Sequence, residues 1–144
     1  MSACELCDNL GGEVLWQDGR CRVVRVDGAD GMAFPGFCRV IWQDHVGEMT
    51  GLPGADRRHL MNVVFATEAA LRALLRPDKI NLASLGNVVP HLHWHVIPRW
   101  RDDSHFPAPV WATAQRAPGA RPGIDNADLA LAIAEFLSEE TAGT

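Results

Sequence analysis

Three histidines alternate with apolar residues in the segment 91–95 (HLHWH), and this pattern constrains the fold more than any other feature of the chain. In an extended strand successive side chains point to opposite faces, so residues two apart share a face. The imidazoles would then form a row with a spacing of roughly 7 Å, while Leu92 and Trp94 point into a core. A helix does not place residues two apart on one face. The segment therefore predicts a strand, and Pro98 suits its end because proline cannot donate to a ladder.

A row of imidazoles suits a nucleophile that attacks phosphorus. A neutral imidazole is nucleophilic near pH 7, and the central residue, His93, has another imidazole on either side. His91 or His95 can contact a phosphate oxygen or protonate a leaving group. Backbone N–H groups near Asn87 and Val88 can stabilise the developing negative charge. The chain has neither a Gly-x-Ser-x-Gly elbow nor a Gly-Lys-Ser/Thr phosphate loop, so the histidines are the candidate catalytic groups.

The segment 91–97 resembles the signature of the histidine triad (HIT) family, His-x-His-x-His followed by two apolar residues. The stretch from Asn81 to Arg99 is most similar to the bacterial branch of diadenosine tetraphosphate hydrolases, in which many members carry Gln where this chain has His91. The resemblance implies that His93 takes up a nucleoside monophosphate covalently, that His95 binds phosphate and that water releases the monophosphate. It implies cleavage at the α-phosphorus of dinucleoside polyphosphates, nucleoside phosphoramidates or acyl-adenylates.

The resemblance also implies substrate-binding residues. Asn87 lies where family members carry an amide beside the phosphate, although an Asn after Gly86 also suits a tight turn. Asn81 matches an upstream amide position near the ribose and phosphate. A carboxylate is expected on the ribose hydroxyls, and Asp27 and Asp30 are both candidates.

The loop after Pro98 mixes cations with aromatic residues, from Arg99 to Trp111. It could edge a nucleotide pocket, with an arginine such as Arg99 on phosphate and a tryptophan against a base. It could equally be a solvated loop with a structural tryptophan.

A Cys-x-x-Cys pair, Cys4 and Cys7, stands near the start of the chain without the βαβ pattern of a thioredoxin-like redox protein. In some HIT proteins a structural zinc is held by such a pair, a histidine after the third strand and the first triad histidine. Matched by position, the set here is Cys4, Cys7, His45 and His91. The alternative is two unrelated buried cysteines with His91 in the active site.

The composition indicates one globular domain spanning residues 1–144, with 47% apolar and 22% charged residues. The formal net charge is −5, so the protein does not attract the negatively charged backbone of a nucleic acid polymer. No nucleic acid partner is expected. No apolar run approaches the ~20 residues of a membrane span, and no signal pattern opens the chain, so a cytoplasmic protein without a membrane partner is expected. The remaining cysteines, Cys21 and Cys38, are expected to be buried thiols. No organic cofactor is expected.

Hydrophobic periodicity predicts strands near 13–16, 21–26, 37–42, 79–85 and 91–97, and a turn-rich loop over 27–31. It predicts an amphipathic helix from about Asp56 to Arg76 and a C-terminal helix from about 126 to 140. The resemblance implies an α+β fold, an antiparallel sheet of about five strands with the long helix packed on it, and a homodimer.

The alternatives to the dinucleoside polyphosphate hydrolase are an adenosine phosphoramidase of the same family and a nucleotide-binding interaction module with incidental turnover. A metallohydrolase with all three histidines on one metal is disfavoured, because alternating imidazoles on a strand converge poorly on one ion.

Overall fold

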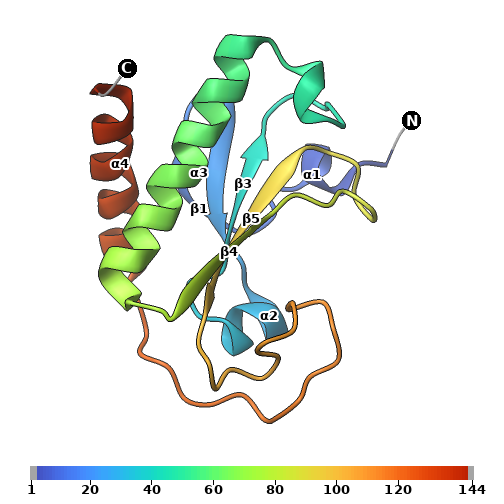
Figure 1. Ribbon diagram of the computed structural model, residues 1–144. Helices are drawn as coiled ribbons and strands as arrows, with labels where there is room; N and C mark the ends of the chain where they lie inside the picture. The colour runs from blue at the N-terminus through green and yellow to red at the C-terminus, as the bar shows by residue number, and fades with distance from the viewer. Residues whose placement is uncertain (1–2, 143–144) are drawn as a thin grey trace.

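A computed structural model describes residues 3–142 and shows one five-stranded antiparallel sheet with helices on both of its faces (Figure 1). The strands pair in the order β1-β2-β3-β5-β4. Their bounds are β1 Glu13–Gln17, β2 Cys21–Arg25, β3 Cys38–Trp42, β4 Lys79–Ala83 and β5 His93–Arg99. This architecture confirms the expected α+β fold.

Two long helices, α3 (Gly54–Leu75) and α4 (Asn126–Ala142), lie side by side against one face of the sheet (Figure 1). The helical stripe of α3 buries Leu60 and Leu71 completely, and both belong to the same core cluster as Val40 and Val96 of the sheet. At the start of α4, the backbone N–H of Ala127 donates to Asp125 Oδ1 at 2.7 Å, as expected of a capping aspartate. Helical periodicity therefore located both elements correctly.

The opposite face of the sheet carries a different set of side chains. Because side chains alternate along a strand, Arg39 and Ile41 of β3 share this face with His93 and His95 of β5, while Val40 and Trp94 face α3. A short helix, α1 (Glu5–Asp8), covers part of this face through Leu6, which packs in a cluster with Ile41. The two histidines thus stand between the sheet and the N-terminal segment.

The loop expected over residues 27–31 is instead a short helix, α2 (Gly28–Ala33). The backbone N–H of Phe34 donates to Asp30 O at 2.9 Å, which closes a helical turn although the segment has no apolar stripe to signal it. A short 3₁₀ helix at Met49–Gly51 precedes α3.

The last strand begins at His93 rather than at His91. Leu92 is held by the segment that follows β3: its N–H donates to Val46 O at 2.8 Å and its carbonyl accepts from Trp42 N at 3.1 Å. A tight turn was expected at Gly86 and Asn87. Because β4 ends at Ala83 and β5 begins at His93, these two residues instead belong to a longer irregular segment, 84–92.

Within residues 3–142, none of the helices combines the length and apolar character that crossing a membrane requires.

Candidate active site and metal cluster

A cavity of about 700 Å³ opens on the face of the sheet that carries His93, His95 and Arg39. Its wall is assembled from segments that are far apart in the sequence. Besides these three residues, it is lined by Glu5, Leu6, Asn9, Gly11, Gly12, Asp27, Leu85, Gly86, Asn87, Val88, Val89 and Trp111.

The ring of His93 is fixed in one tautomer by the backbone. Its Nδ1 lies 2.6 Å from the carbonyl oxygen of His91, and since a carbonyl only accepts, Nδ1 must carry the proton. Nε2 is then left with its lone pair. Burial lowers the pKa of His93, although the hydrogen bond to His91 opposes this effect. At neutral pH the ring is uncharged, and its free nitrogen is nucleophilic.

His95 stands beside His93 with a distance of 4.9 Å between the ring centroids. Its ring also makes an edge contact with Trp111 at 4.9 Å and packs near Phe37. Burial, followed by the charges of His93 and Arg39, lowers the pKa of His95 to about 3. Its Nδ1 is buried without a hydrogen-bond partner in the described chain. His95 is therefore a neutral imidazole in the cavity wall.

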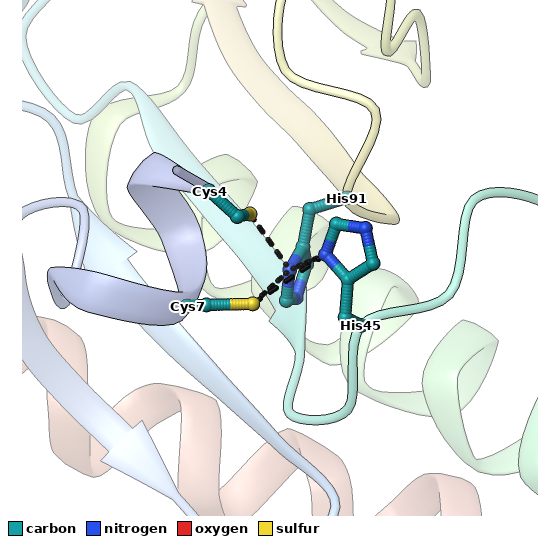
Figure 2. A group of neighbouring side chains, drawn as sticks. All are labelled: Cys4, Cys7, His45 and His91. Atoms are coloured by element: carbon teal, nitrogen blue, oxygen red, sulfur yellow. Dashed lines mark hydrogen bonds between the residues drawn. The ribbon is translucent and has the colours of Figure 1, made fainter. Parts of the chain in front are cut away.

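The first triad histidine, His91, is fully buried and belongs to a separate cluster (Figure 2). Its Nδ1 lies 3.5 Å from Cys4 Sγ, 3.4 Å from Cys7 Sγ and 3.3 Å from His45 Nδ1. The four ligand atoms all lie within 4.8 Å of one another. The structure thus brings together the four residues expected to bind zinc.

The spacing and chemistry of this cluster fit a zinc ion. With ordinary Zn–N and Zn–S bond lengths, tetrahedral ligands are separated by about 3.3 Å for two nitrogens and about 3.6 Å for nitrogen and sulfur. His91 Nε2 lies 2.6 Å from the carbonyl of Trp42 and therefore carries the proton, which leaves the lone pair of Nδ1 directed at the cluster. His91 does not line this cavity and belongs to the cluster instead, so its expected direct contact with the substrate stays a prediction.

The expected substrate-binding residues divide into two groups. Asn87, Val88 and Asp27 line the cavity. Asn81, Arg99 and Asp30 do not: Asp30 lies exposed on α2. The exposed Val88, at 92%, forms an apolar part of the rim.

Arg99 is 2% exposed, and its guanidinium is hydrogen-bonded to groups inside the protein. Its Nε donates to Asp103 Oδ2 at 2.8 Å, and its Nη1 donates to Asn81 Oδ1 at 2.8 Å. The guanidinium also binds the carbonyl of Ala108. Arg99 and Asn81 therefore join the end of the sheet to the segment after β5, and in this structure neither reaches the cavity.

Arg39 is a cavity residue that sequence reasoning did not single out. It pairs with His95 across β3 and β5, so it stands on the same face as the imidazole. The signal available was a single cation in the otherwise apolar segment 38–42 (CRVIW). This cation could be assigned to the cavity only once the pairing of β3 with β5 was known, and the local sequence does not reveal that pairing.

The fold and the pair of neutral histidines define the class: this is the α+β fold of nucleotide hydrolases and transferases that carry a histidine row on a strand. The particular family follows from the sequence, because the HIT domain family matches residues 12–102. The chain belongs to the HIT family, whose members bind nucleotides and are generally nucleotide hydrolases. The comparison with curated proteins gave no match.

Solved structures share the fold at low sequence identity. A histidine triad protein from Marinobacter aquaeolei VT8 is 24% identical, with a TM-score of 0.70 over 96% of each chain. A histidine triad protein from Bradyrhizobium japonicum is 23% identical, with a TM-score of 0.66 over 98% of this chain and 96% of that chain. A zinc-bound histidine triad family protein from Mycobacterium smegmatis is 17% identical, with a TM-score of 0.56 over 99% of this chain and 98% of that chain.

Proposed function

We propose that this protein cleaves dinucleoside polyphosphates of the diadenosine tetraphosphate kind at the α-phosphorus, with His93 as the nucleophile. The hydrogen bond from His93 Nδ1 to His91 O is the observation that carries the proposal, because it leaves Nε2 as the free nitrogen of a cavity residue. Nε2 attacks the α-phosphorus and the bond to the departing phosphate oxygen breaks. Water then attacks the same phosphorus, the P–N bond breaks, and the nucleoside monophosphate leaves.

The neighbouring residues support this reaction through contacts with the substrate. His95 orients a phosphate oxygen next to His93, from which its ring is 4.9 Å away. The segment that contains Asn87 and Val88 supplies backbone N–H groups for the developing negative charge. Asp27 lines the cavity and is therefore a better candidate than Asp30 for the ribose hydroxyls.

We also propose that Cys4, Cys7, His45 and His91 hold a structural zinc. Bound there, the ion cross-links the N-terminal segment to the residues that precede β5. Its effect on the reaction is indirect, since His91 supplies the carbonyl that fixes the tautomer of His93.

Replacement of His93 tests the nucleophile. We expect His93→Ala to lower the release of AMP by at least about 10³-fold and to retain nucleotide binding. The assay should include diadenosine tetraphosphate, diadenosine triphosphate and adenosine phosphoramidate, so that the preferred substrate class is measured at the same time. His59→Ala is a suitable control, because His59 bonds to Asp18 and does not line the cavity. Unchanged turnover in His93→Ala would refute the assignment.

The family resemblance leads us to propose a homodimer as well. Sedimentation analysis of the purified protein would measure its mass against the 15.7 kDa of one chain.

A further inference from the structure

Arg39 differs from the other residues of the cavity in charge. Among the described residues that line the cavity, it is the one lysine or arginine, and the carboxylates of the wall are Glu5 and Asp27. No carboxylate oxygen of the described chain lies within 4.0 Å of its guanidinium, by the criterion that identifies the other ion pairs. A partly buried cation without a close counter-ion is costly to maintain, so its position calls for an explanation.

Buried arginines elsewhere in the chain have their donors occupied by structural partners. Arg22 donates to the carbonyls of Leu6, Asn9 and Leu10. Arg99 bonds to Asp103, Asn81 and Ala108, as described above.

Arg39 makes one hydrogen bond, from Nη1 to Gly11 O at 3.3 Å, and its guanidinium lies 5.9 Å from the ring centroid of Phe37. A guanidinium has five N–H donors, so most of those on Arg39 are not used by the protein. These contacts orient the side chain and leave the planar fork available to a ligand.

The wall beside Arg39 includes the backbone of Gly11 and Gly12, and Gly11 O accepts the hydrogen bond from Nη1. Gly11 and Gly12 both have positive φ, at 87° and 153°, a backbone conformation that favours glycine. An added Cβ would lie 3.0 Å from Ile41 Cδ1 at Gly11 and 2.3 Å from the carbonyl oxygen of Arg25 at Gly12, so the packing against the sheet behind them also requires glycine.

The strand register places Arg39 relative to the reacting groups. Ile41 pairs with His93, and Arg39 pairs with His95, so the backbone of Arg39 lies one side-chain step, roughly 7 Å, along the same face from the position opposite the nucleophile. An arginine side chain is long and carries its donors at its end, so from this position the guanidinium can meet a phosphate group other than the one that His93 attacks.

We propose that Arg39 forms an anion subsite that binds a second phosphate group of the substrate, separate from the phosphorus that His93 attacks. This inference rests on the proposed reaction at His93. It identifies the substrate class as nucleotides that carry a further phosphate, either along the 5′ chain or on the ribose. Arginine suits this role because its fork binds phosphate through two parallel hydrogen bonds.

Calorimetric titrations with three probes test the subsite without requiring turnover. The probes are AMP, the non-cleavable adenosine 5′-(α,β-methylene)diphosphate and adenosine 3′,5′-bisphosphate. We expect the wild-type protein to bind one of the two bisphosphorylated probes at least about tenfold more tightly than AMP. The probe that binds more tightly shows whether the second phosphate belongs to the 5′ chain or is attached to the ribose.

Replacement of Arg39 should remove this preference. The quantity compared is the dissociation constant of AMP divided by that of the bisphosphorylated probe that binds more tightly. We expect Arg39→Met to bring this ratio to within about twofold of one. Arg39→Lys should retain part of the preference, because lysine keeps the charge without the fork. Arg58→Met is the matched control, since it removes one positive charge from an exposed position on α3 outside the cavity. Circular dichroism of each variant checks that it folds, and Arg39→Lys carries the test if Arg39→Met does not fold.

Two results would overturn the subsite: a wild-type protein with no preference for either bisphosphorylated probe, or a preference that persists in Arg39→Met. Both concern binding alone, so they leave the assignment of His93 to be judged by turnover. Conversely, undiminished turnover in His93→Ala would refute the nucleophile while the ratio of dissociation constants still reported on Arg39.

Discussion

His91, His93 and His95 lie in different surroundings, because their ring nitrogens have different hydrogen-bond partners. His91 donates through Nε2 to Trp42 and directs Nδ1 at the cysteine cluster, whereas His93 donates through Nδ1 and keeps Nε2 free. His95 has no partner for Nδ1 in the described chain. The residue type alone gives three similar imidazoles, and the neighbouring carbonyls distinguish them.

At the same scale, the ion pair of Arg99 and Asp103 predicts a large loss of stability when it is broken. Both residues are almost fully buried, at 2% and 1% exposure. We expect Asp103→Asn to reduce the free energy of unfolding by about 3 kcal/mol, because it leaves the guanidinium of Arg99 without its counter-ion. Urea denaturation measures the difference. Asp102→Asn, at the exposed neighbouring position, should change it by less than about 1 kcal/mol, and equal effects at the two positions would contradict the argument.

The same carboxylate predicts a dependence of stability on pH. Burial alone would raise the pKa of Asp103, but hydrogen bonds from Arg99 and from three backbone N–H groups lower it from 3.8 to about 2. The lowered value means that the folded state favours the ionised form, so the contribution is present above pH 3.8 and is lost as the pH falls toward 2. It amounts to about 2 kcal/mol. The stability difference between wild type and Asp103→Asn should therefore shrink over this window, and a constant difference would refute the assignment.

At the scale of elements, we expect α1 to depend on the cluster of Cys4, Cys7, His45 and His91 that we propose to bind zinc. It has four residues and no side-chain cap, which is too short for a stable helix on its own. Cys4 and Cys7 flank or belong to it, and Glu5 and Leu6 line the cavity. A bound zinc would therefore fix one wall of the active site as well as the N-terminal segment.

Metal removal tests this dependence. We expect Cys7→Ser to lower the zinc content measured by elemental analysis, to lower the melting temperature and to weaken AMP binding. A chelator should produce the same changes in the wild-type protein and little further change in Cys7→Ser, which makes the variant the control for the chelator. Wild-type protein purified without chelators and free of tightly bound metal would contradict the zinc site.

The helix α3 provides a matched pair of substitutions. Leu71 is fully buried, whereas Leu74 is 43% exposed on the same helix. We expect Leu71→Ala to cost about 3 kcal/mol, because it opens a cavity in the main core, and Leu74→Ala to cost less than about 1 kcal/mol. Chemical denaturation of both variants measures the difference, and similar losses would show that the helix does not pack by this face.

The elements also show how far the sequence predicts this fold. The two long helices follow from their apolar stripes, and the alternation around His93 and His95 predicts their shared strand. The helix α2 was missed because its segment, 28–33, has no periodic apolar face. The place of Arg39 in the cavity wall was missed because it depends on the pairing of β3 with β5, which joins segments more than fifty residues apart.

At the scale of the whole molecule, the two faces of the sheet have separate tasks. The helices α3 and α4 bury one face in the main core (Figure 1). The other face carries the cavity, whose wall combines the N-terminal segment, the loop between β4 and β5, and Trp111. The positions of these segments along the chain do not predict that they share one cavity, because they come together only when the sheet has formed.

This division predicts which parts of the chain respond to a ligand. We expect AMP to slow amide hydrogen exchange in residues 5–12 and 85–89 together, since both segments line the cavity, and to change α4 little. The measurement is hydrogen exchange followed by mass spectrometry with and without AMP, and Arg58→Met serves as a control that should show the same protection. Because the cavity lies on the face opposite α4, protection confined to α4 would place the nucleotide on the wrong side of the sheet. Protection of only one of the two segments would mean that the ligand does not span the cavity.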